Sequence, residues 1–152
     1  MLKKAYFAGG CFWGIQKAFD STKGVMNTSV GYSGGITKNP TSKEVYSKKT
    51  GHAETTQIDY DETKISYNEL LTIFFKLHNP TELNMQGPDI GEQYRSAIFY
   101  TNKEQKLEVE KFIRQEQKKY TNKIVTQVEK FKEFFPADDY HQKYYKTHPG
   151  VC

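Results

Sequence analysis

The sequence contains no apolar run of about 20 residues, the length that a membrane-spanning helix requires. Its first eight residues carry two lysines and lack the continuous apolar stretch and the cleavage site of a secretory signal peptide. Only two cysteines occur, Cys11 and Cys152, which are too few for the disulfide framework of a small secreted protein. We therefore expect a cytoplasmic protein without membrane association, in which the cysteines serve catalysis rather than structure.

Strong charge is also missing, because the formal net charge is only +4 and acidic residues separate the lysines. Nucleic-acid binding is therefore not favoured. The densest basic and aromatic stretch, residues 140–146, could stack on bases, but it is more typical of a surface whose tyrosines pack inward. The four histidines lack the spacing of a metal site, and we expect neither a metal nor a cofactor.

The length and the pattern of elements indicate a single domain over residues 1–152, with 136–152 as a C-terminal tail. Three pairs of residues have the spacing of a helix-capping box, namely Thr41 and Glu44, Ser66 and Glu69, and Thr101 and Glu104. A first helix should follow residue 10, and the strands should span residues 4–8, 25–32, 53–60, 96–100 and 124–129. We expect a two-layer α+β sandwich with a mixed sheet, a split β-α-β (ferredoxin-like) core and a C-terminal coil.

Cys11 lies where a short apolar segment stops and a helical pattern begins, between Gly10 and Phe12. A helix N-terminus favours negative charge and lowers the pKa of a thiol, and only the thiolate is a good nucleophile. Phe12 and Trp13 could form an apolar wall beside the sulfur. The alternative is a small core residue after a tight turn. The surrounding residues favour a reactive thiol.

Glu54 is placed by strand alternation on the same face as Thr56, Ile58 and Tyr60. Burial on that apolar face would raise the pKa of the carboxyl group, which could then donate a proton near pH 7. The spacing leaves open whether Glu54 is instead exposed at a strand end or paired with a lysine.

The segment 87–96 is a polar, glycine-containing loop of the kind that often carries binding residues. Asp89 and Tyr94 could present hydrogen-bonding groups to a ligand. Equally, Asp89 could form an Asx-turn and Tyr94 could enter the core. Two other functions remain open on the residues alone: a hydrolase that pairs Cys11 with His52 or His141, and an RNA-binding module.

Several separated motifs, in order, resemble the A-class peptide methionine sulfoxide reductases. The family's hallmark Gly-Cys-Phe-Trp-Gly is present as residues 10–14, and the similarity continues at residues 31–35, 50–54, 79–81, 89–96 and 139–142. This resemblance implies a reductase for the S epimer of methionine sulfoxide, both protein-bound and free. Oxidised proteins and the free amino acid would be its substrates.

The resemblance also implies a role for each candidate residue. Cys11 would attack the sulfoxide sulfur, Phe12 and Trp13 would hold the methyl group, and Glu54 would supply the proton. The two loop residues, Asp89 and Tyr94, would hydrogen-bond the sulfoxide oxygen, directly or through water. Methionine would leave with Cys11 as a sulfenic acid.

Cys152 matches the family's tail cysteine, which attacks the sulfenic acid. The resulting Cys11–Cys152 disulfide would be opened by thioredoxin through thiol–disulfide exchange. We expect the protein to act as a monomer.

One position departs from the family pattern. After residues 39–41 the family usually has a second active-site tyrosine, whereas this chain has Ser42. Either Tyr94 and Glu54 suffice without it, or Tyr46 compensates.

Overall fold

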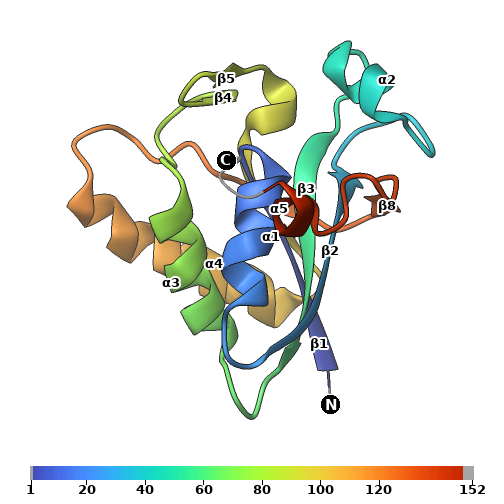
Figure 1. Ribbon diagram of the computed structural model, residues 1–152. Helices are drawn as coiled ribbons and strands as arrows, with labels where there is room; N and C mark the ends of the chain where they lie inside the picture. Colours follow the sequence, from blue (N-terminus) through green and yellow to red (C-terminus); the bar gives the residue numbers. More distant parts are fainter. Residues whose placement is uncertain (1, 149–152) are drawn as a thin grey trace.

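The computed structural model describes residues 2–148, in which a mixed sheet is packed against helices (Figure 1). Short connections join most of these elements. In chain order they are β1 (Leu2–Gly9), α1 (Phe12–Asp20), β2 (Val25–Ser33), α2 (Ser42–Tyr46), β3 (Ala53–Asp61), α3 (Tyr67–Leu77), β4 (Met85–Gln86), β5 (Asp89–Ile90), the 3₁₀ turn η1 (Glu92–Tyr94), β6 (Ser96–Tyr100), α4 (Lys103–Glu116), the 3₁₀ turn η2 (Gln117–Lys119), β7 (Gln127–Lys130), β8 (Phe135–Pro136) and α5 (Tyr144–Thr147).

The main sheet has the strand order β7-β6-β1-β3-β2-β8 within the described residues. β3 lies between β1 and β2 and is antiparallel to both, so β1 and β2 run parallel to each other and are connected through α1. β7 pairs with β6 in parallel, which makes the sheet mixed. This arrangement confirms the expected α+β fold with a split β-α-β core.

Alternation along β1 divides the core between the two faces of the sheet. Phe7 is fully buried on the helical face, where its ring stacks on Phe74 of α3 at a centroid distance of 4.8 Å. Tyr6 points to the opposite face and stacks on Phe131 at 4.0 Å. Helices therefore cover one face of the sheet, and the segment that leads to β8 covers part of the other.

Local capping fixes where the helices begin. Thr41 and Glu44 form the expected capping box at α2, and Ser66 and Glu69 form the one at α3. At α4 the expected cap is wrong by one residue. The side chain of Asn102 accepts the backbone N–H of Gln105 at 2.8 Å, so the N-cap is Asn102 and not Thr101. Asparagine is at least as good an N-cap as threonine.

The last strand also begins later than expected, at Gln127 instead of Ile124. The backbone N–H of Ile124 donates to the side chain of Gln117 at 2.8 Å, and that of Val125 donates to the Pro80 carbonyl at 2.8 Å. These two residues are therefore held away from the sheet ladder, and pairing with β6 starts only at Gln127.

The chain after β8 returns to the outer side of β2 and α1. The Gln142 side chain accepts the Val30 N–H at 2.9 Å and donates to the Val30 carbonyl at 2.8 Å. Lys143 forms an ion pair with Asp20 at the end of α1, with an N–O distance of 2.7 Å. The segment that precedes the C-terminus is thus attached to the core by specific polar contacts, and it includes the short helix α5 as well as coil.

Three short segments gather at one end of the molecule, around the start of α1. Figure 1 shows α2 and the β4–β5 ribbon at the top, where β1 ends and α1 begins. No helix within residues 2–148 is both long enough and apolar enough to cross a membrane.

Candidate active site

Cys11 is the N-cap residue of α1, and its side chain is half-buried. Gly10 before it has a φ of +92°, and a Cβ there would lie 2.8 Å from the side chain of Gln86, so this turn requires glycine. The first turn of α1 contains no acidic residue. No carboxylate of the helix itself therefore opposes a thiolate at this N-terminus.

Glu54 lies on β3 opposite Tyr32 of β2, and its side chain is buried with 3% of the residue exposed. Its Oε1 accepts the backbone N–H of Phe12 at 3.2 Å, which places the carboxyl group beside the start of α1. Burial, assisted by the charge of Asp89, raises the pKa of Glu54 to about 8 in spite of the Phe12 hydrogen bond. At neutral pH this carboxyl group is therefore mainly protonated.

Asp89 and Tyr94 come from the loop that joins α3 to β6. Asp89 lies on β5, which pairs with β4 in a two-stranded ribbon, and Tyr94 ends η1. The pKa of Tyr94 is raised far above its ordinary value, first by burial and then by the charges of Glu54, Tyr46, Asp89 and Cys11. These electrostatic interactions show that four predicted residues from separate parts of the chain share one site.

Tyr46 belongs to the same cluster. Its phenol shares a hydrogen bond with Tyr94, and its pKa is raised by burial and by the charges of Glu54, Cys11 and Asp89. Ser42 lies one helical turn earlier on α2, and its hydroxyl is hydrogen-bonded to Tyr32 and His141 instead. The structure therefore brings Tyr46, rather than Ser42, to the predicted site.

Phe12 and Trp13 lie next to Cys11 on the first turn of α1, but they differ in exposure. Phe12 is buried, with 2% exposed, against Tyr32, whereas Trp13 is half-buried. The indole ring of Trp13 stacks on Tyr144 of α5 at a centroid distance of 3.9 Å and an interplanar angle of 12°. Trp13 thus provides the accessible part of the apolar wall, and Phe12 supports it from beneath.

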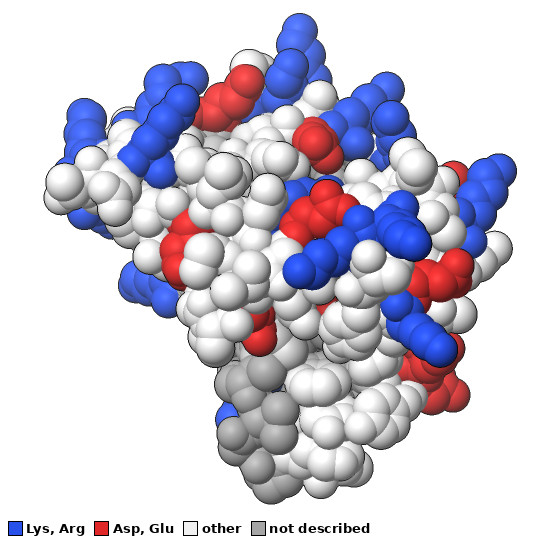
Figure 2. All heavy atoms as spheres, turned by 90° about the horizontal axis from the view of Figure 1, so that it is seen from above, with Lys and Arg blue, Asp and Glu red and all other residues white. Residues whose placement is uncertain are grey.

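The surface at this end of the molecule is only weakly patterned in charge. Figure 2, which looks onto this end, shows Lys and Arg side chains mostly around the outline, with uncharged surface and a few acidic side chains between them. The uncharged surface is suited to a substrate that carries little net charge.

Comparison with known proteins decides between the remaining functions. A family model described as "Peptide methionine sulfoxide reductase" matches residues 3–152. The chain belongs to this family. Its members are oxidoreductases, so the chain is an enzyme of the peptide methionine sulfoxide reductase class.

Individual relatives agree in sequence and in structure. Peptide methionine sulfoxide reductase MsrA of Pasteurella multocida is 49% identical over 149 residues, which are 98% of this chain and 86% of the relative. The reduced form of Mxr1 from Saccharomyces cerevisiae aligns with a TM-score of 0.94 at 34% identity, over 99% of this chain and 88% of that chain. The structure of Mxr1 in complex with Trx2 aligns at 0.68 and 27% identity, over 94% and 84% of the two chains.

The two alternatives that the residues left open do not fit the reductase structure. Both ring nitrogens of His52 are engaged by residues 35 and 37, and those of His141 by Trp13 and Ser42, so neither is directed at Cys11 as a hydrolase base. In the stretch proposed for RNA, Tyr144 is buried and Lys143 is bound to Asp20.

Cys152, the expected resolving cysteine, lies outside the residues that the structure describes. Its role therefore stays a prediction, as does the division of the chain into one domain with a tail.

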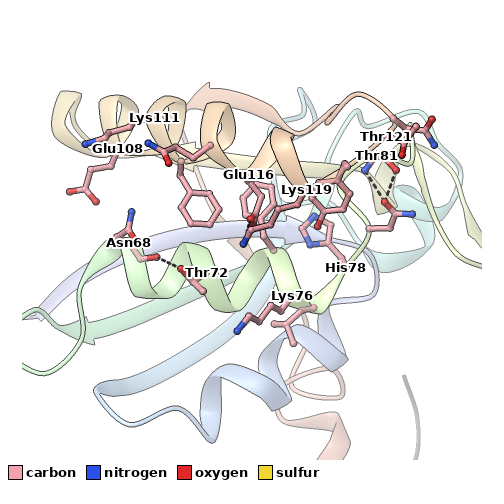
Figure 3. A pocket seen from close by; sticks show the side chains of 17 residues that line it. Asn68, Thr72, Lys76, His78, Thr81, Glu108, Lys111, Glu116, Lys119 and Thr121 are labelled. Atoms are coloured by element: carbon pink, nitrogen blue, oxygen red, sulfur yellow. Dashed lines mark hydrogen bonds and ion pairs between the residues drawn. The ribbon is translucent and has the colours of Figure 1, made fainter.

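A hollow of about 1400 Å³ between α3 and α4 lies apart from this site (Figure 3). It is lined by charged residues, and among them Glu116 pairs with Lys119 at 2.8 Å. His78 at its floor is buried, which lowers its pKa to about 4, and its ring contacts the Phe74 carbonyl and the Ser96 hydroxyl. No sequence pattern predicted this hollow, and none of the predicted site residues that the structure describes lines it.

Proposed function

We propose that this reductase acts on the S epimer of methionine sulfoxide, protein-bound or free, through the cluster around Cys11. The observation that carries the proposal is a buried Glu54, held beside the N-terminus that bears the thiol, whose burial raises its pKa to about 8. A sulfoxide is a poor electrophile because attack at sulfur places charge on oxygen, so a proton delivered there in a buried site lowers the barrier.

In the first step, the Cys11 thiolate attacks the sulfoxide sulfur while Glu54 transfers its proton to the oxygen. The attack joins the two sulfurs, and the protonated oxygen then passes to the Cys11 sulfur as the bond between the sulfurs and the substrate S–O bond break. Methionine leaves and Cys11 becomes a sulfenic acid, so the substrate sulfur is reduced and the cysteine sulfur oxidised. Asp89 and Tyr94 hydrogen-bond the oxygen, directly or through water. The neutral form of Glu54 suits this step for a second reason, since it does not repel the neighbouring thiolate.

Tyr46 supplies the second phenol that the family pattern places at Ser42. Its hydrogen bond to Tyr94 and its electrostatic contact with Cys11 and Glu54 support this assignment. Either phenol can donate to the developing negative charge on oxygen, because a phenol is protonated at neutral pH and the pKa of both is raised further.

Cys152 then resolves the sulfenic acid. Its thiol displaces water from the Cys11 sulfur to form a disulfide, which a thioredoxin dithiol reduces in the cytoplasm. The length of the chain beyond His148 supports this step. His148 stacks on Tyr144, which in turn stacks on Trp13 beside Cys11. The four residues from 149 to 152 can span up to about 14 Å. The solved complex of Mxr1 with Trx2 supports thioredoxin as the reductant. We propose that a monomer performs the cycle.

Mass spectrometry of the reduced protein after addition of methionine S-sulfoxide tests the proposal. We expect one methionine per protein and the loss of two hydrogens from the chain, whereas the R epimer should give neither. Cys152→Ser should retain a single turnover and lose thioredoxin-driven cycling. Undiminished cycling in that variant would remove the resolving role, and absence of methionine from the S epimer with wild type would overturn the function itself.

A further inference from the structure

A chain of hydrogen bonds runs from Trp13 to Tyr32 of β2 and joins four parts of the chain. The indole Nε1–H of Trp13 donates to Nδ1 of His141 at 3.2 Å. Nε2 of His141 lies 2.8 Å from Oγ of Ser42, and Oγ of Ser42 lies 2.9 Å from the hydroxyl of Tyr32. The residues come from α1, the C-terminal segment, α2 and β2.

Donor and acceptor chemistry fixes the direction of this chain. An indole nitrogen can only donate, so Nδ1 of His141 must be unprotonated to accept from it. A neutral imidazole then carries its proton on Nε2, and that proton is donated to Ser42. The hydroxyl of Ser42 can accept this bond and still exchange a second one with Tyr32.

The position of Ser42 leaves its hydroxyl available for the hydrogen bonds to His141 and Tyr32. Thr41, not Ser42, caps α2, since the Thr41 side chain accepts the N–H of Glu44 at 3.1 Å. Ser42 is thus the first residue of the helix, and its short side chain reaches His141 without entering the cluster around Cys11.

We propose that His141 and Ser42 are positioning residues that hold the ring of Trp13, and with it the apolar wall beside Cys11, through a single tautomer of His141. Trp13 is held on one ring face by Tyr144 and at its N–H by His141. Stacking alone allows the indole to slide or turn in its plane, whereas the hydrogen bond fixes its orientation. The part of this inference that concerns substrate rests on the proposed function.

Protonation of His141 would break the chain, because a proton on Nδ1 opposes the indole N–H. The titratable groups that face the ring are Asp138 on the same segment, Tyr140 beside it at 5.1 Å between ring centroids, and Tyr32 beyond Ser42. Burial lowers the pKa of His141 below its usual value, although Asp138 opposes this shift. The chain is therefore intact at neutral pH and is lost on acidification.

Nitrogen-15 NMR of the wild-type protein tests the tautomer without any substrate. The chain has one tryptophan and therefore one indole N–H signal, and His141→Gln identifies the His141 resonances among the four histidines. We expect Nδ1 to be unprotonated and Nε2 protonated at neutral pH. The indole signal should shift on acidification with the same midpoint as His141. A proton on Nδ1 at neutral pH, or an indole signal that ignores the titration, would overturn the proposal.

Kinetics of Ser42→Ala test the consequence for the site. We expect KM for methionine sulfoxide to rise about fivefold, the size of one lost hydrogen bond, and kcat to change less than about twofold. Ser42→Thr, which keeps the hydroxyl, should restore KM. Ser47→Ala is the matched control, because Ser47 ends the same helix and its hydroxyl bonds only to the Glu44 carbonyl among the described contacts.

The two measurements separate the possible failures. An unchanged KM and an unmoved indole signal in Ser42→Ala would show that Ser42 does not position Trp13. Inactive wild-type protein with the expected tautomer would overturn the proposed substrate and leave the hydrogen-bond chain standing. If Ser42→Ala does not fold, the wild-type titration decides alone.

Discussion

The cluster around Cys11 and the hollow between α3 and α4 contain similar chemical groups but differ in how their charges are compensated. Each includes a glutamate that is mostly withdrawn from solvent, Glu54 with 3% and Glu116 with 8% exposed. Glu116 pairs with Lys119, whose side chain is 74% exposed (Figure 3). Glu54 instead accepts a bond from an uncharged backbone N–H and lies near Asp89.

This difference determines which glutamate can act as an acid. A carboxylate beside a lysine is stabilised in its charged form, whereas a buried carboxyl without a cationic partner retains its proton. In this protein the charges around a buried carboxyl group therefore indicate the reactive site better than the volume of a hollow does.

Glu54→Gln should produce the largest effect. Glutamine retains the shape and an acceptor for the Phe12 N–H but cannot transfer a proton, so single-turnover reduction should slow by about 10²- to 10⁴-fold. Glu116→Gln makes the same chemical change in the hollow and should alter the rate less than about twofold. Rapid-quench measurement of methionine from the reduced proteins compares the two. Equal rates for wild type and Glu54→Gln would remove Glu54 from the mechanism.

Glu54→Gln should also stabilise the protein increasingly as the pH rises. The folded state holds a proton on Glu54 up to about pH 8, whereas the unfolded chain releases it near the ordinary glutamate pKa of 4.5. The protonated Glu54 therefore contributes to the wild-type free energy of unfolding fully below about pH 4.5. This contribution, at most about 5 kcal/mol, is lost as the pH rises through about 8. Urea unfolding of both proteins between about pH 4 and pH 9 measures the difference.

The same unfolding series on Glu116→Gln is the control. Its stability should stay within about 1 kcal/mol of wild type, because Lys119 is 74% exposed and solvent screens its attraction to Glu116. A gain in stability of Glu54→Gln that does not change with pH would contradict the raised pKa of Glu54.

Tyr46→Phe should give the smallest of these effects. Loss of one hydrogen-bond donor, with Tyr94 still present, should lower the single-turnover rate by about three- to tenfold. Tyr120→Phe is a suitable control, since Tyr120 lines the hollow between α3 and α4, outside the cluster. A rate equal to wild type in Tyr46→Phe would eliminate the compensation for Ser42.

Features that depend on neighbouring residues were predictable from the sequence. The capping boxes of α2 and α3 are set within a few residues, and the structure confirms them. Alternation placed Glu54 on the face of Ile58 and Tyr60 but left its burial open, because both faces of β3 are buried at this end of the strand. The approach of Asp89 and Tyr94 to Glu54 depends on the β4–β5 ribbon, whose two-residue strands have no detectable period. Their place in the site came from the family resemblance instead.

Contacts between segments that are distant in the chain could not be predicted from the sequence. Tyr32 and His141 lie in motifs of the family resemblance, but no sequence pattern links them, because their connection through Ser42 joins positions up to 109 residues apart. The attachment of Lys143 to Asp20 was missed for the same reason. Strand order likewise follows from which edges remain available after the helices pack.

The contacts of Gln142 with Val30 have a further consequence for the outer strand of the sheet. An uncovered edge strand offers its N–H and C=O groups to other chains and invites aggregation. Here one side-chain amide occupies both groups of Val30, and β8 pairs with Gly31 and Tyr32 immediately beyond it. The segment that leads toward the C-terminus thereby covers part of β2 that would otherwise be open to pairing with another strand, and the same segment carries His141, which accepts the indole N–H of Trp13.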